Sequence, residues 1–152
     1  MTDKEQTAMP MPIKNYTTKI DAYTSIGEIQ SALARGGAKQ IMVEYENERP
    51  TAISFTIQRG EGLRGFRLPA ATEGTLRVFA KQKLNAKPEQ AEMTAWRNVR
   101  DWVLAQVALI ECCDVPVDQV FLPYLVDQSG RRTLYEAYSS GKLMLGNGDE
   151  NG

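Results

Sequence analysis

Three consecutive stretches of the chain are rich in β-branched and aromatic residues: KQIMVEYE at 39–46, TAISFTIQ at 51–58 and LRGFRLP at 63–69. Such stretches, when turn residues separate them, are typical of strands. The connecting sequences NERP and RGEG are typical of turns, and Gly60 and Gly62 are expected to supply the positive φ angles of the second one. The pattern predicts a three-stranded antiparallel meander.

The N-terminal third combines a short alternation with the first helical spacing. NYTTKI, at 15–20, alternates and predicts one more strand. Apolar residues in IGEIQSAL, at 26–33, recur every three or four positions, as on the buried face of a helix. Ser25 followed by Glu28 forms a capping box, and two glycines beginning at Gly36 supply a stop, so we expect a helix of about ten residues.

Two helices are predicted after the meander. Thr72 is expected to cap a helix that runs through Lys83. Pro88 suits the first turn of a helix, where a missing N–H costs nothing. The long helical pattern that follows predicts a helix over 89–113.

The C-terminal part gives weaker signals. Asp118 is able to cap VFLPYL at 120–125, but Pro123 prevents a long regular element, so both a helical turn and a strand stay open there. TLYEAYSSG, at 133–141, predicts one or two helical turns that end at a glycine. Three residues of this segment are expected to pack back on the body: Leu134, Tyr135 and Tyr138.

These elements predict a single α+β domain, an antiparallel sheet of three to four strands with helices packed on one face. The expected domain spans 14–141, between a disordered N-terminal tail at 1–13 and a flexible C-terminal tail at 142–152. Hydrophobic residues make up 42% and charged residues 24% of the chain, which is typical of a globular protein that needs no disulfide or metal for stability.

The predicted long helix carries two apolar strips and a minor polar sector. In the polar sector, Arg97 and Asp101 are spaced i to i+4 as a surface ion pair. The two strips require cover on two sides, by the sheet and by the C-terminal segment. The first strip contains Trp96, Val99, Val103, Val107 and Ile110, and the second contains Trp102, Leu109 and Cys113.

Several residues of this helix invite a functional interpretation. Trp96 and Trp102 point about 120 degrees apart on a helix, so they form no common stacking platform and are expected in the core. Cys112 and Cys113 lack further cysteine or histidine ligands for zinc and are expected to pack. Gln106 falls between the strips, where we expect burial and a hydrogen bond to neighbouring backbone, with a ligand or interface contact as the alternative.

The sequence offers no catalytic constellation. Histidine is absent, which excludes imidazole acid/base chemistry, histidine metal clusters and Ser-His or Cys-His nucleophiles. Glu44, Glu46 and Glu48 alternate as on a solvated face. RGEGLRG, at 59–65, lacks the spacing of a phosphate-binding loop and joins two strands. Catalysis by paired carboxylates stays open in principle, so an enzyme is the third choice after two classes of binding protein, and we expect no cofactor and no metal site.

Charge is distributed unevenly along the chain although the net charge is only −1. Residues 59–100 hold 9 basic and 4 acidic side chains, whereas residues 101–152 hold 3 and 8. If the basic segment forms one groove, it suits the phosphates of a polynucleotide or a small nucleotide. The alternative is that folding scatters these charges and pairs them with acidic residues. The candidate phosphate-binding residues are Arg59, Arg64, Arg67, Arg97 and Arg100.

The expected compartment is the cytoplasm. The first residues lack the basic and apolar regions of a secretory signal, and no stretch is apolar enough to span a membrane. The only cysteines are adjacent, which disfavours a disulfide framework.

Taken together, KNYTTKI, FRLP, AWRNVRDWVLAQVALIE, VFLPYLV and TLYEAY resemble a family of small uncharacterised proteins encoded by bacteriophages, prophages and mobile elements. The resemblance spans about residues 14–138 and implies an accessory role. Two classes of function follow as expectations: a non-enzymatic binder of nucleic acid or nucleotides, or a module that modifies or blocks a host or phage protein. The Pro-bearing VFLPYLV segment is a plausible docking surface for the second class.

Overall fold

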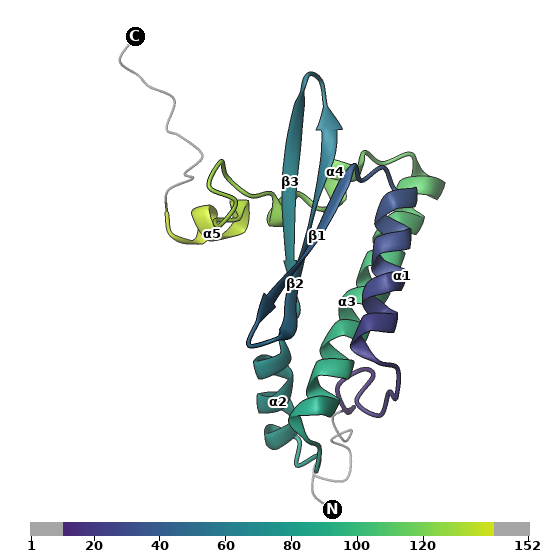
Figure 1. Ribbon diagram of the computed structural model, residues 1–152, viewed down its shortest axis with the longest axis vertical. Helices are drawn as coiled ribbons and strands as arrows, with labels where there is room; N and C mark the ends of the chain where they lie inside the picture. The colour runs from purple at the N-terminus through teal and green to yellow at the C-terminus, as the bar shows by residue number, and fades with distance from the viewer. Residues whose placement is uncertain (1–10, 142–152) are drawn as a thin grey trace, which may run out of the picture.

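The computed structural model describes residues 11–141, and these form an α+β domain with a three-stranded antiparallel sheet. Helices α1 and α3 lie side by side against one face of the sheet, whereas α5 lies beyond β3, away from them (Figure 1). The predicted fold class is confirmed. In chain order the elements are α1 (Ala22–Arg35), β1 (Gln40–Glu46), β2 (Arg49–Arg59), β3 (Gly62–Pro69), α2 (Thr72–Lys81), α3 (Pro88–Cys113), α4 (Val117–Val120), the 3-10 turn η2 (Leu122–Tyr124) and α5 (Leu134–Ser139).

The meander has the predicted strands in the order β1-β2-β3. The β1–β2 turn places Asn47 and Glu48 at φ angles of 51° and 65°, the left-handed geometry of a two-residue hairpin turn. In the β2–β3 turn Gly60 has a φ of 60°, but Gly62 does not adopt a positive φ and begins β3 instead. A bulge between Glu44 and Tyr45 shifts the β1–β2 register.

The segment 15–20 is not the predicted strand: a turn covers 14–17, and 18–20 are irregular. Asn15 adopts a left-handed φ of 65°, and its side-chain amide donates to Asn98 and Asp101 of α3. These bonds hold the segment against α3, so it does not join the sheet. Helix α1 then begins at Ala22, earlier than predicted, because Asp21 accepts the capping hydrogen bond in place of Ser25, which is buried inside the helix.

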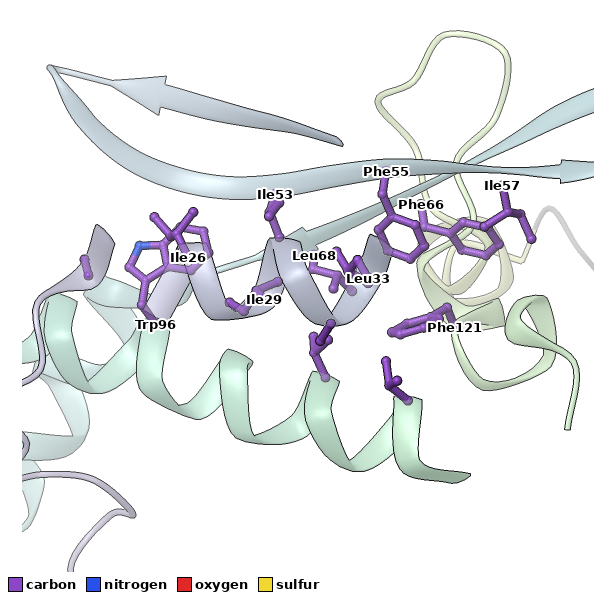
Figure 2. Packing of buried hydrophobic residues seen from close by; sticks show 14 residues of the cluster. Ile26, Ile29, Leu33, Ile53, Phe55, Ile57, Phe66, Leu68, Trp96 and Phe121 are labelled. Carbon is purple, nitrogen blue, oxygen red and sulfur yellow. The ribbon is translucent and has the colours of Figure 1, made fainter. Parts of the chain in front are cut away.

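The core lies between the sheet and the pair α1 and α3 (Figure 2). Phe55 and Phe66 stack with ring centroids 5.2 Å apart, and Phe121 packs edge-on against Phe55. Trp96 is fully buried, as predicted, and its indole Nε1 donates to the Pro50 carbonyl at 3.2 Å. The remaining labelled core residues are Ile26, Ile29, Leu33, Ile53, Ile57 and Leu68.

The ends of the later helices refine the predictions. Helix α2 ends at Lys81, and Thr72 is its first residue and makes no cap, because Ala71 occupies the N-cap position. Helix α3 begins at Pro88 and ends before Asp114, which has a left-handed φ of 51°, so the predicted long helix is confirmed. Thr133 caps α5 through the Glu136 amide.

Of the two alternatives for the segment 120–125, the helical turn is found, and only an isolated β-bridge follows it. Asp118 lies inside the first turn of α4, where Pro116 takes the N-cap position, so Asp118 is no cap. The chain then forms η2 and extends, and Leu125 makes an isolated antiparallel bridge with Phe66 of β3. The Val126 amide donates to the Gly65 carbonyl at 2.9 Å. The C-terminal segment therefore covers part of the outer edge of β3.

Several residues that the sequence placed in the core are exposed. Cys112 and Cys113 are both exposed free thiols, Leu109 is 43% exposed, and Gln106 is only partly buried. The returning chain contacts the second strip of α3 at Trp102, through Phe121 and Tyr124. It does not cover the cysteines, Leu109 or Gln106. On α5, Tyr135 and Tyr138 are more than half exposed and do not pack back as predicted.

The domain boundaries are described only in part. Ile13 donates its amide to Gln82 at 2.9 Å, so the body includes at least this residue of the predicted N-terminal tail. The tails expected at 1–10 and 142–152 lie outside the described residues. Among residues 11–141, no helix combines the length and apolar character needed to cross a bilayer.

Candidate functional site

Two of the predicted phosphate-binding arginines hold the helices together. Arg97 and Arg100 of α3 both donate to the Glu28 carboxylate of α1, at 2.8 and 2.6 Å. The hydrogen bond from Arg100 and the charge of Arg97 lower the pKa of Glu28. Arg97 also reaches Ser25, so it pairs across the helices and not with Asp101 as predicted. Both guanidinium groups are therefore engaged in the fold.

Asp101 forms the second half of this network. It accepts hydrogen bonds from Lys14, Asn15 and Arg100 at 2.9 to 3.0 Å. Burial opposes its ionisation, but these three donors outweigh that effect and lower its pKa to about 2. The network ties the N-terminal turn and α1 to the middle of α3.

The other three arginines lie elsewhere. Arg67, on the sheet face opposite the helices, pairs with Glu44 at 2.8 Å. Arg59 and Arg64 lie at the projecting end of the β2–β3 hairpin, where Arg59 pairs with Asp118 at 3.3 Å (Figure 1). Arg64 has no ion pair among residues 11–141 and contacts only the neighbouring Leu63 carbonyl. The five arginines thus occupy three separate places, and the structure does not bring them into one groove.

An apolar cavity of about 320 Å³ opens beside Trp102, between β3, α2, α3 and η2. Its apolar α3 wall is built by Ala95, Val99 and Trp102, which are spaced i, i+4 and i+7 on one side of the helix; Val99 belongs to the first apolar strip and Trp102 to the second. Tyr124 packs edge-on against Trp102, with ring centroids 5.4 Å apart, and forms the opposite wall. The lining residues are Leu68, Pro69, Ala71, Thr75, Ala95, Asn98, Val99, Trp102 and Tyr124.

Two polar side chains of this cavity, Thr75 and Asn98, are hydrogen-bonded within the fold. Thr75 donates its hydroxyl to the Ala71 carbonyl at 2.8 Å. Asn98 donates to the Lys14 carbonyl and accepts from Asn15. The cavity therefore offers mainly apolar surface, and an apolar group that enters it loses no hydrogen bond.

A second cavity, of about 330 Å³, adjoins the first because both include Pro69 and Tyr124. Its other lining residues are Arg67, Pro123, Thr133, Tyr135 and Glu136. Glu44 neutralises Arg67, whereas the Glu136 carboxylate has no cationic partner among the described residues. The second cavity is therefore partly apolar, with a net negative rim.

A cleft of about 800 Å³ lies where the β1–β2 turn meets the starts of α2 and α3. Glu92 is almost buried there, and Arg49 engages both of its carboxylate oxygens, one of them at 2.8 Å. This pair raises the pKa of Arg49. Because Glu92 is already ion-paired, the cleft presents no free buried base. No cluster of metal-ligating side chains occurs within residues 11–141.

Sequence reasoning placed Val99 in the first apolar strip, Trp102 in the second, and Pro123 and Tyr124 in the VFLPYLV docking segment; Pro123 lines only the second cavity. It missed the contributions of α2 and β3, which reach the site only through the tertiary fold. Comparison with protein-family models, curated proteins and solved structures gives no match.

Proposed function

We propose that the protein is a non-catalytic protein-binding module that receives an apolar side chain of a partner polypeptide beside Trp102. The observation that carries this proposal is the apolar cavity itself, which is open to solvent and whose Thr75 and Asn98 side chains are already hydrogen-bonded within the fold. Interfaces draw most of their binding energy from a few side chains buried in such pockets.

The size of the cavity favours a side chain over a whole cofactor. Its volume of about 320 Å³ is at the lower end of the roughly 300–1,000 Å³ typical of small-molecule sites. The adjoining cavity carries the unpaired Glu136 carboxylate. The expected partner segment therefore has an apolar anchor followed by a basic residue.

A library of displayed random peptides tests this proposal. The wild-type protein is expected to select peptides with an apolar anchor, and Val99→Trp, which fills the cavity, should lose them. Leu109→Trp is the matched control, because it adds the same side chain to an exposed position of α3 outside the cavity. The proposal would be contradicted if Val99→Trp, with an unchanged melting temperature, retained the selected peptides as well as the wild type does. It would also be contradicted if the wild type selected no peptide.

The cellular setting of this partner follows from two further expectations. The resemblance to phage and mobile-element proteins favours a host or phage factor as the partner. The cytoplasm is the compartment we propose, because Cys112 and Cys113 remain exposed free thiols, which suits a reducing environment.

Nucleic-acid or nucleotide binding is the second candidate, and the projecting end of the β2–β3 hairpin is the observation that favours it. Lys39 precedes β1 and comes level with Ile57 and Arg64 when the strand register is extended by one residue. With Arg59 these cations form a short basic row, and Lys39 and Arg64 have no ion pair within residues 11–141. Such a row is able to contact phosphates.

Fluorescent oligonucleotides measured at increasing salt concentration test the second candidate. Binding at the hairpin should weaken steeply with salt and disappear in Arg64→Glu, whereas Arg131→Glu, an exposed substitution elsewhere, should preserve it. Absence of salt-sensitive binding by the wild-type protein would remove this candidate and leave the peptide-binding proposal unaffected.

A further inference from the structure

The sheet has one edge that no described segment covers. β3 is partly covered by Leu125 and Val126, which bridge to it through Phe66 and Gly65. β1 pairs only with β2, so its outer edge is free within residues 11–141. An uncovered strand presents unpaired backbone N–H and C=O groups that are able to pair with another strand.

The free edge is apolar at its centre. Ile41, Met42 and Val43 occupy the middle of β1, and the Met42 side chain is 60% exposed on the face opposite the helices. The nearest charged side chains, Lys39 and Glu44, flank this centre. Proteins usually blunt a free edge with central charges, a proline or a short strand. This strand has seven residues and none of these features at its centre.

Helix α1 extends the uncharged surface beside this edge. Its ionic side chains turn toward α3, where Glu28 meets Arg100 and Arg35 meets Glu111. The flank turned away from α3 carries no charge, and depletion of charge is characteristic of interface centres. Its residues, spaced i, i+4, i+7 and i+11, are Tyr23, Gly27, Gln30 and Ala34.

Two further observations describe the surroundings of this flank. Interaction with the Tyr45 side chain raises the pKa of Tyr23, so the start of α1 lies near the end of β1. A Cβ atom added at Gly27 would meet nothing within 4 Å, so another helix is able to approach closely there. Because the charged Arg49 and Glu92 act on Tyr23, the uncharged part of the flank is the remainder, at Gly27, Gln30 and Ala34.

We propose that two copies of this chain pair antiparallel through their β1 edges and form a continuous six-stranded sheet. The pairing is centred on Met42, which then lies opposite Met42 of the second copy. Ile41 faces Val43 of the second copy, and Gln40 faces Glu44, so apolar residues meet apolar residues and no like charges are opposed. This register keeps both helix layers on the same side of the sheet, because opposite residues share a face.

Light scattering coupled to size exclusion tests the proposal first. The wild-type protein should have twice the 17.0 kDa mass of one chain, with a monomer appearing on dilution. Met42→Lys should shift it to the monomer with an unchanged circular dichroism spectrum, because Met42 is exposed and outside the core. Thr56→Lys, on the same sheet face of the central strand, is the matched control and should remain dimeric.

Cross-linking tests the register. In a Cys112→Ser and Cys113→Ser background, Met42→Cys should be cross-linked to a dimer by a short bismaleimide, whereas Thr56→Cys should stay monomeric on a denaturing gel. A wild-type protein that remains a monomer at all concentrations, or equal cross-linking of both cysteine variants, would overturn the proposal. The inference does not depend on the Trp102 cavity, and the cavity-filling variant should still dimerise.

Discussion

Arg49, at the start of β2, donates to both carboxylate oxygens of Glu92 on α3 and so joins the sheet to the long helix. The two partners differ in environment: the Glu92 side chain is 10% exposed, whereas that of Arg49 is 57% exposed. The positive charge of Arg49 therefore offsets the cost of burying the Glu92 carboxylate.

We expect Arg49→Ala to destabilise the fold by about 1–3 kcal/mol, because it leaves a nearly buried carboxylate unpaired at a site that water still reaches. The double variant Arg49→Ala with Glu92→Gln should recover part of this loss. Urea unfolding measures both free energies. Equal stability of Arg49→Ala and the wild type would show that solvent already screens Glu92.

The lowered pKa of Asp101 gives an acid-dependent contribution to stability. Its folded-state pKa of about 2 lies below the value of about 3.9 expected in the unfolded chain. The contribution is therefore fully present above the unfolded pKa and is lost as the pH falls from about 4 toward 2. After allowance for solvent screening, we expect about 1–2 kcal/mol.

Asp101→Asn should remove this part of the acid dependence. The comparison requires urea midpoints of the wild type and the variant at several pH values between neutrality and the acid transition. The two curves should converge at the acid end. A constant difference across the whole range would mean that Asp101 titrates normally, against the hydrogen-bond network described here.

The strands of the meander and the long helix could be predicted because the residue patterns that indicate them are local. The segment 15–20 could not, since its alternation matches a strand, while its actual conformation depends on bonds from Asn15 to Asn98 and Asp101, more than eighty residues away. A left-handed asparagine anchored by a distant helix leaves no signature in a short window of sequence.

The candidate site shows the same limit. The apolar strip that includes Trp102 is visible in the sequence, but a cavity exists only where Ala71, Thr75 and Tyr124 arrive from other elements. The charge pattern of residues 59–100 could not predict the ion pairs for a related reason. Arg100 lies 72 residues from Glu28, and only the packing of α1 on α3 reveals that they are partners.

Val103 is fully buried in the first strip of α3. Val103→Asp should prevent folding or lower stability by several kcal/mol, because an unpaired carboxylate would enter the core. Ala105→Asp, at an exposed position of the same helix, is the control and should have a nearly unchanged melting curve by circular dichroism. An unchanged midpoint for Val103→Asp would contradict the packing of α3 on the sheet.

Cys112 and Cys113 lie at the exposed end of α3, with their sulfur atoms 3.2 Å apart. Their mutual hydrogen bond raises the pKa of Cys113. Double replacement by alanine should change stability by less than about 0.5 kcal/mol, as is usual for surface substitutions. Both thiols should also react with a colorimetric disulfide reagent in the native protein. A large loss of stability, or thiols that react only after denaturation, would restore the packing role that the sequence suggested.

The arginines of the predicted phosphate site should separate into two classes when they are replaced. Arg100 is only 26% exposed and bonds to both Glu28 and Asp101, so Arg100→Gln should cost about 1–2 kcal/mol and lower the melting temperature by several degrees. Arg64→Gln removes no ion pair of the described residues and should leave the melting temperature unchanged, although it removes any binding of phosphate at the hairpin. Thermal melts of the two variants, with oligonucleotide titrations of each, make the distinction. If Arg100→Gln melts like the wild type and loses salt-sensitive oligonucleotide binding instead, its guanidinium serves a ligand and does not brace α1 against α3.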